Sequence, residues 1–362
     1  MSVMANWIAI ALFVTAAVVI SPRAQACTIR IRADGNTAAI QQAMDKPGRR
    51  VPIVCLEPGV YKGARLVATR SAVLRRVGQD KVVFDAGAQG RVLTVAQDNI
   101  EVRLEGITLT NGKAEQGGAV ALIRASRLTL QDCWIYANTA TLHGGGAIFA
   151  NSGQLDLVRT RITGNSGDRA AAIDLTGVVQ ARLFATLVAD NEARGTSDAP
   201  IRLTSSAQLH LEGATVAYNS GSGVVLQPDG PGRRKLTVVS SIIMGKPDAI
   251  TVQRAEADAV RVESSVLWGG FGFVALDLAS QRALPSFNLK LAERYRPETG
   301  SVAIGLGRCV DRLAKLDLTG KPRGRVCTAG ALEAPPAEFA ATMALRRKQP
   351  AVQKKPKDWR DI

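Results

Sequence analysis

Four polar residues in the middle of the chain have the side chains that acid–base chemistry on a sugar needs. They are Asp156, Arg182, His210 and Glu212. An arginine can hold a sugar carboxylate through two hydrogen bonds, a histidine can take or give a proton, and carboxylates can serve as acid and base. We expect Asp156 and Glu212 to lie about 10 Å apart, near the upper limit for the carboxylate pair of an inverting glycosidase. The predicted chemistry is that of a lyase, hydrolase or epimerase acting on an acidic polysaccharide.

The surface that carries these residues would offer further contacts to a polymer. Two rows of outward-facing positions can be read from the repeats of the chain. The first row is Arg103, Thr129, Asp156, Arg182, His210, Thr237 and Arg261, and the second is Glu105, Gln131, Val158, Phe184, Glu212, Val239 and Glu263. We expect Arg103, Arg261 and Phe184 to contact the substrate. A purely structural role is the alternative, because opposite charges on adjacent strands stabilise a sheet by up to about 1 kcal/mol per pair.

Asparagine recurs at the interval that would bring these side chains onto one face. The residues are Asn111, Asn138, Asn165, Asn191 and Asn219, with steps of 27, 27, 26 and 28 residues. A fixed period of this length is typical of a solenoid, in which each repeat is buried against its neighbours. Asparagine suits a turn here, because its side chain tolerates the left-handed backbone region and can hydrogen-bond the turn of the next repeat.

Each repeat also contains three short apolar pairs, which we interpret as strands. In one repeat the pairs lie at positions 128 and 130, 133 and 135, and 148 and 150. Spacing by two is a strand period, and no segment between the pairs has a helical period. Three strands per turn predict an all-β parallel β-helix of about ten coils, with equivalent residues stacked about 4.8 Å apart. A leucine-rich repeat is the main alternative, but it would continue after the asparagine with leucine spacing, where residues 144–150 read Gly-Gly-Gly-Ala-Ile-Phe-Ala.

The two ends of the chain differ from the repeats. Residues 1–26 contain an apolar run of 13 residues and a small-residue cleavage site, so we interpret them as a secretory signal peptide. Residues 27–333 form the predicted β-helix domain, with a short capping helix after residue 36 and the 309–327 segment covering the other end. The basic tail, residues 334–362, is expected to be disordered or to hold one short helix near residues 339–346.

Five cysteines in an exported chain are expected to pair as far as geometry allows. We predict the bridges Cys27–Cys55 and Cys309–Cys327. Cys133 stands in a column of small inward residues and should be a buried free thiol. Lipidation of Cys27 is an alternative to its disulfide, although the preceding residues lack the aliphatic position of a lipobox.

The charge balance points to a polyanionic partner. The chain carries a net charge of +15, and without the predicted signal peptide 45 basic and 31 acidic residues leave +14. The tail holds seven basic and three acidic residues, and we take the remaining excess to be spread over the coils. In an exported protein the available polyanions are acidic polysaccharides, lipopolysaccharide and anionic lipid head groups. Solubility alone is the other explanation.

Three segments resemble the right-handed parallel β-helices of the pectin-lyase-like superfamily. Residues 128–151, Leu-Thr-Leu-Gln-Asp-Cys-Trp-Ile-Tyr-Ala-Asn followed by a Gly-Gly-Gly-Ala-Ile-Phe-Ala-Asn stretch, resemble the repeats of polymorphic outer-membrane-type surface proteins. The opening, with Thr-Ala-Ala-Ile-Gln-Gln-Ala-Met and Pro-Gly-Val-Tyr61, and the end from Ser301 to Glu333 are also similar to such β-helices, although Gly305 and Thr328 stand where the closing pattern usually has Asp. The resemblance implies a right-handed solenoid in which polysaccharide lies along the sheet that carries the two rows.

Several kinds of site have no sequence support. The chain lacks the Asn-Thr-Asp, paired Asp and Gly-His-Gly pattern of polygalacturonases, a clustered carboxylate set for calcium and a phosphate-binding glycine loop. We therefore expect no metal, no cofactor, no nucleic-acid partner and no membrane span. The predicted protein is a monomeric, exported β-helix that binds, or alternatively cleaves or epimerises, an acidic polysaccharide in the periplasm, at the cell surface or outside the cell. The contrasting hypothesis is a non-catalytic structural or adhesion-type surface protein.

Overall fold

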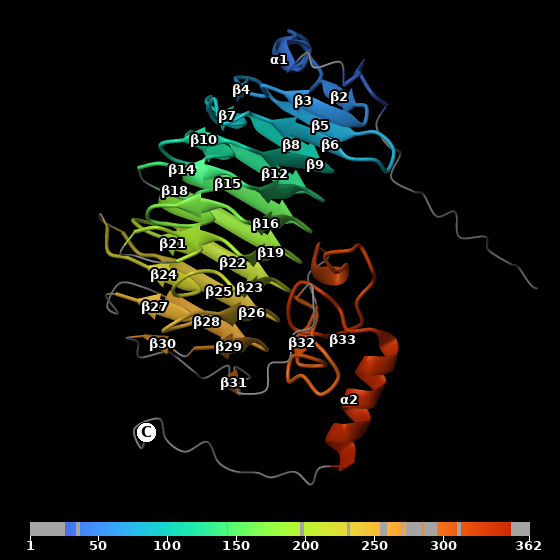
Figure 1. The fold of residues 1–362 in the computed structure, drawn as a ribbon, viewed down its shortest axis with the longest axis vertical. Helices are drawn as coiled ribbons and strands as arrows, with labels where there is room; N and C mark the ends of the chain where they lie inside the picture. Colours follow the sequence, from blue (N-terminus) through green and yellow to red (C-terminus); the bar gives the residue numbers. More distant parts are fainter. Residues whose placement is uncertain are drawn as a thin grey trace, which may run out of the picture.

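The computed structural model shows a parallel β-solenoid of about nine turns with little helix (Figure 1). The predicted fold class is confirmed. The structure describes residues 26–33, 37–142, 144–195, 199–229, 232–253, 259–269, 271–272, 284–285, 295–309 and 313–348. Residues 1–25 of the predicted signal peptide and residues 349–362 of the predicted tail lie outside these ranges.

Each turn contributes one strand to each of three columns, and all neighbours within a column are parallel. The first column consists of β2 (Ile53–Leu56), β5 (Ala72–Arg76), β8 (Glu101–Glu105), β12 (Arg127–Gln131), the second halves of β15 (Ile148–Val158) and β18 (Ile173–Phe184), β22 (Gln208–Glu212), β25 (Lys235–Val239) and β28 (Ala259–Glu263), with β1 (Ile29–Ile31) paired to β2. The second column consists of β3 (Gly59–Lys62), β6 (Val82–Asp85), β9 (Ile107–Thr110), β13 (Trp134–Tyr136), β16 (Arg161–Thr163), β19 (Leu187–Ala189), β23 (Thr215–Ala217), β26 (Ile242–Met244), β29 (Val266–Trp268) and β31 (Leu284–Pro285). The third consists of β4 (Leu66–Ala68), β7 (Leu93–Val95), β11 (Val120–Leu122), the first halves of β15 and β18, β21 (Ile201–Leu203), β24 (Val224–Leu226), β27 (Ile250–Val252) and β30 (Phe271–Gly272).

The first and third columns join into one 17-stranded sheet, because β15 and β18 continue around the corner between them. Gly153 and Gly177 stand at this corner with φ angles of 87° and 62°, a backbone region that L side chains rarely adopt. A small parallel sheet follows the asparagine turn, formed by β10 (Lys113–Ala114), β14 (Thr139–Ala140), β17 (Ser166–Gly167) and β20 (Glu192–Ala193).

The apolar pairs predicted from the repeats line the interior as one continuous core. Cys133 belongs to this interior and is free and buried, as predicted. Its thiol donates to the carbonyl oxygens of Leu104 and Gln131 at 3.5 and 3.3 Å. Thr160, one coil further on, donates to the equivalent carbonyls of Leu130 and Val158, so the thiol fills the place of a hydroxyl in a stacked column. Burial raises the pKa of Cys133 to about 12.

The asparagine ladder contains Asn138, Asn165, Asn191 and Asn219, but its first predicted member is wrong by one position. Tyr136 pairs with Thr110, so the residue equivalent to Asn138 is Gly112 and not Asn111. The ladder asparagines do not have left-handed backbones either. The positive φ angles belong to the residue before each of them, and Asn111, with a φ of 55°, occupies that preceding position.

The side chains of Asn138, Asn165 and Asn191 each link three coils, and that of Asn219 links two. Asn165 Nδ2 donates to Thr163 O in its own turn, to Ile135 O in the preceding coil and to Asn191 Oδ1 in the next, over 2.9 to 3.1 Å. Its Oδ1 accepts from the backbone and side-chain nitrogens of Asn138 at 3.0 and 2.9 Å. These bonds satisfy polar groups of a turn that is buried from water.

Helix α1 (Thr37–Asp45) caps the N-terminal end and buries Ile40, Ala43 and Met44 against the first coils (Figure 1). The disulfide Cys27–Cys55 ties the entering chain to β2, as predicted. The helix places an amphipathic face over a sheet end that would otherwise expose core residues.

The C-terminal arm, which we define as residues 295–309 and 313–334, does not simply close the far end. It turns back along the outer face of the second column, beside β19 to β29 (Figure 1), where Leu318, Ala331 and Leu332 pack against Leu187 and Ala189. The arm contains the antiparallel pair β32 (Gly307–Arg308) and β33 (Val326–Cys327), the 3-10 helix Leu313–Lys315 and the predicted disulfide Cys309–Cys327. Helix α2 (Pro336–Lys348) follows it and includes the segment for which a short helix was the alternative to disorder.

Candidate functional site

Strand register brings the four predicted residues together on the outer face of the first column. Asp156 pairs with Arg182 and Arg182 pairs with His210, while Phe184 pairs with Glu212 in the neighbouring row. The two rows read from the repeats are the rows that the strands form, from Arg103 to Arg261. The surroundings of each side chain decide what chemistry is open to it.

Asp156 is held by two arginines and is almost inaccessible. Arg182 donates from Nε and Nη2 to the two carboxylate oxygens at 2.6 and 2.8 Å, and Arg127 donates from Nε to Oδ2 at 3.2 Å. The Asp156 side chain is 7% exposed. Both oxygens of this carboxylate are thus occupied by hydrogen bonds within the protein. The same geometry directs Arg182 to Asp156 and away from a sugar carboxylate.

His210 and Glu212 form a second pair on this face. His210 Nε2 lies 3.3 Å from Glu212 Oε2, with 32% of the histidine side chain and 7% of the glutamate side chain exposed. The histidine is therefore more accessible than the two carboxylates, Asp156 and Glu212. The guanidinium of Arg323, from the C-terminal arm, lies beside Gly213. Burial lowers the pKa of Arg323, and the charges of Glu333, Asp317 and Glu212 oppose that lowering. The patch thus sits where the first column meets the arm.

Phe184 cannot stack on a sugar as predicted, because it is only 2% exposed. It packs with Val158 against Ala314 of the arm. Its ring lies 5.7 Å from that of His210 and 5.9 Å below the guanidinium of Arg182, so it supports those side chains from beneath. The arm that covers Phe184 lies more than one hundred residues later in the chain. It has no sequence repeat, so this contact could not be predicted from the period.

The remaining predicted contacts are also engaged within the protein. Arg103 forms an ion pair with Glu105 at 2.6 Å and donates to Gln131 Oε1 at 2.7 Å. Arg261 is paired with Glu263 in the same strand, although its side chain is 67% exposed. The middle of this face is thus a network of internal ion pairs, as the structural alternative predicts.

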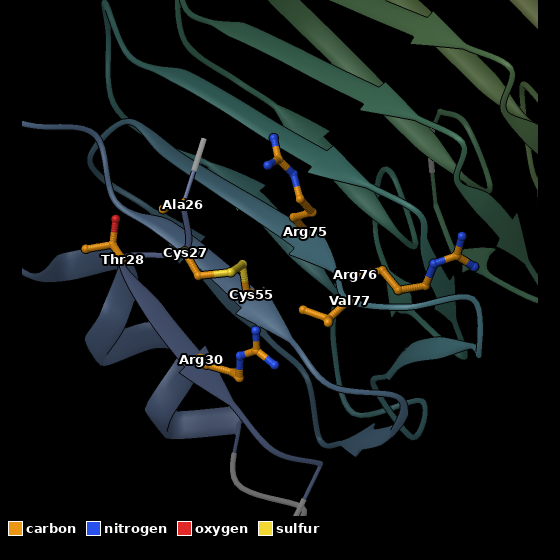
Figure 2. A pocket seen from close by; sticks show the side chains of 8 residues that line it. All are labelled: Ala26, Cys27, Thr28, Arg30, Cys55, Arg75, Arg76 and Val77. Atoms are coloured by element: carbon orange, nitrogen blue, oxygen red, sulfur yellow. A yellow bond between two sulfur atoms is a disulfide. The ribbon is translucent and has the colours of Figure 1, made fainter. Parts of the chain in front are cut away.

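An open depression of about 740 Å³ lies at the N-terminal end of the same face. Figure 2 shows the Cys27–Cys55 disulfide in it, with the side chains of Arg30, Arg75 and Arg76 around it. The register Arg30 to Cys55 to Arg75 continues directly into Glu105, so this depression belongs to the second predicted row. Arg75 is paired with Glu105, whereas the exposed Arg30 has no ion-pair partner among the described residues.

A second depression, of about 290 Å³, lies at the corner where the chain enters β2, β5 and β8. Its cations are Lys46, Arg49, Arg50 and Arg70, all exposed, and none of them has an ion-pair partner in the part of the chain that the structure describes. The carboxylate of nearby Asp45 accepts instead from Gln41 and Thr69. No aspartate or glutamate lines either depression. Both hollows therefore favour an anion.

The sequence already shows that basic residues concentrate at the N-terminal end, whereas we predicted that they are spread evenly over the coils. Residues 27–76 contain ten lysines and arginines against three aspartates and glutamates. That excess is about half of the net charge that remains after removal of residues 1–26. Electrostatic attraction for a polyanion should therefore be strongest over the first coils.

Metal and membrane functions find no structural support in the described ranges. Among those residues, no group of three or more His, Cys, Asp or Glu side chains could hold a metal ion. No helix in the same ranges has the length and apolarity needed to cross a bilayer. The two disulfides indicate an oxidising, extracytoplasmic location. Comparison with protein-family models, with curated proteins and with solved structures finds no match to this chain.

Proposed function

We propose that this chain is an exported β-helix protein of the cell envelope that binds an acidic polysaccharide through its basic N-terminal end. The observation that carries the proposal is the pair of depressions lined by lysine and arginine without a single acidic residue. Exposed cations that lack internal partners keep their full attraction for a ligand carboxylate or sulfate. The resemblance to pectin-lyase-like β-helices and to polymorphic outer-membrane-type repeats supports a glycan partner at the cell surface.

The pairing and burial of Asp156 and Glu212 favour binding over catalysis. Both oxygens of Asp156 accept hydrogen bonds from Arg182, and Glu212 is nearly inaccessible. A lyase, hydrolase or epimerase would need at least one of these acids free to meet the substrate. The proposed protein therefore holds the polymer and leaves it unchanged.

The test is binding to a panel of uronic-acid polymers, with a neutral dextran as the uncharged comparison. The triple variant Arg49→Gln, Arg50→Gln and Arg70→Gln removes three exposed cations from the second depression. If each contributes about 0.5 kcal/mol, affinity for polygalacturonate should fall about tenfold. Raising the salt concentration from about 0.05 to 0.5 M should weaken wild-type binding as well, because exposed charges are screened.

A matched control keeps the same change in net charge. Lys113→Gln, Lys321→Gln and Arg325→Gln remove three exposed cations that line neither depression. Affinity should then stay within about twofold of wild type. Equal losses of affinity in both triple variants would show that overall charge, and not the depression, causes the effect. If wild type does not bind, the proposal fails and the non-catalytic scaffold hypothesis is favoured. Polymer cleavage or epimerisation by wild type that Asp156→Ala abolishes would restore the catalytic hypothesis.

A further inference from the structure

Two aromatic side chains lie side by side on the outer face of the second column. Trp134 and Tyr136 are two residues apart on β13 and so point to the same side, with ring centroids 4.5 Å apart and planes inclined by 32°. Both side chains are half-buried. Trp134 Nε1 donates to Thr163 Oγ1 on the next coil at 2.8 Å, which fixes the indole ring. At this separation the two rings stack on each other, so only the outer face of each ring is left for a ligand. Such a pair stands out on a solenoid that has few aromatic residues.

Two cations flank this aromatic platform, which we define as Trp134 and Tyr136. Lys81 Nζ lies 5.9 Å from the Trp134 ring centroid, and the exposed Arg161 is the register neighbour of Trp134 on the following coil. Neither cation forms an ion pair within the described ranges. Asp85, in register with Tyr136 two coils earlier, accepts from Gly87 N and Asn111 Nδ2. The platform is therefore electropositive.

The C-terminal arm gives the platform an edge. Along the same row, Arg161 is exposed, whereas Leu187 on the next coil is 3% exposed because Leu318 of the arm packs over it. The exposed part of the second column thus ends where the arm begins beside β19 (Figure 1). A single outer ring face beside the edge of the arm suits one sugar ring better than a broad protein surface.

We infer that the aromatic platform is a sugar-binding subsite, on which one pyranose ring of an acidic glycan stacks while Lys81 and Arg161 bind its carboxylate. The C–H face of a pyranose is apolar and packs on an aromatic ring, and a cation beside that ring supplies the charge complement of a uronic acid. The inference rests on the proposed function and adds a contact on a different column from the two basic depressions.

The experiment measures binding of a short oligogalacturonate and of its carboxyl-reduced, neutral analogue. Trp134→Ala should weaken oligogalacturonate binding about tenfold and neutral-analogue binding by a similar factor, because stacking serves both. Arg161→Gln should weaken only the charged ligand, by about threefold. Trp268→Ala is the matched control, since Trp268 is also half-buried on the second column with a lysine 5.9 Å from its ring, but has no aromatic neighbour on its strand. The Trp268→Ala variant should bind both ligands with wild-type affinity.

Circular dichroism and the unfolding midpoint report whether Trp134→Ala is folded, and Trp134→Phe, which keeps a ring, should recover most of the affinity. Unchanged binding by Trp134→Ala, together with a loss in the Arg49, Arg50 and Arg70 triple variant, would overturn the platform and leave the proposed function standing. Equal losses in the Trp134 and Trp268 variants would also overturn it. A wild-type protein that binds neither polymer nor oligomer would refute the proposed function itself.

Discussion

Replacing one ladder asparagine should cost far more stability than its small side chain suggests. In Asn165→Ala, five side-chain hydrogen bonds are lost at a position that is 1% exposed. The backbone N–H of Asn138 then has no acceptor in a buried turn, which costs about 1–3 kcal/mol. The other four bonds contribute about 0.5 kcal/mol each when part of their partners' capacity is met elsewhere. We expect a loss of about 3–5 kcal/mol in the free energy of unfolding.

Asn111 provides the control, because it occupies the position before the ladder. Its side chain makes one bond, to Asp85 Oδ1 at 2.9 Å, and is exposed. Its backbone has a φ of 55°, which glycine adopts at no steric cost. Asn111→Gly should therefore stay within about 1 kcal/mol of wild type.

Urea unfolding followed by far-UV circular dichroism measures both variants, with the slope checked for a common denatured state. Hydrogen exchange gives a local readout, since the Asn138 amide should lose protection in Asn165→Ala before distant coils do. The reasoning would be refuted if Asn165→Ala lay within about 1 kcal/mol of wild type, or if Asn111→Gly lost as much.

Three further predictions concern single groups. Cys133 should resist thiol reagents at pH 8 until the protein unfolds, because its thiol is buried. Its pKa is about 12 in the folded protein and near 9 in the unfolded chain, so the free energy of unfolding should fall as the pH rises from 9 toward 12. Cys133→Ser should remove that fall in a pH series of unfolding midpoints. Asp156→Asn should lower stability by about 1–2 kcal/mol in urea unfolding through loss of its charged hydrogen bonds, with glycan affinity unchanged in the binding assay; a lost affinity would contradict this. Cys309→Ser with Cys327→Ser should destabilise the arm by about 3 kcal/mol and make it the first site of limited proteolysis, whereas an unchanged cleavage pattern would show that packing alone holds it.

The repeats made most of the solenoid predictable from sequence. Inward apolar pairs recur at a constant interval, so an error in one coil is corrected by its neighbours, and the rows through Asp156 and Glu212 follow from that interval. The repeat interval did not place Asn111 correctly. One asparagine stood a single position from the true column, and side-chain type alone could not distinguish the ladder position from the left-handed position before it.

Contacts outside the repeats were not predictable in the same way. Phe184 is an outward residue by period, yet Ala314 covers it, because a non-repetitive arm returns along the solenoid. The pairing of Asp156 with Arg182 depends on side-chain directions that a row of letters does not contain. Concentration of charge in residues 27–76 was visible in the sequence, but only a structure shows that Arg49, Arg50 and Arg70 line one hollow.

The returning arm also decides how this solenoid can change length in evolution. A coil bonds only to its two neighbours, so duplication or loss of one whole repeat creates no new kind of contact. Between Val158 and Val266 the arm spans several coils at once, and an inserted repeat there would displace one set of its contacts by about 4.8 Å relative to the other. We therefore expect repeats to be gained or lost before β15, between the basic end and the arm, and their number after it to be fixed.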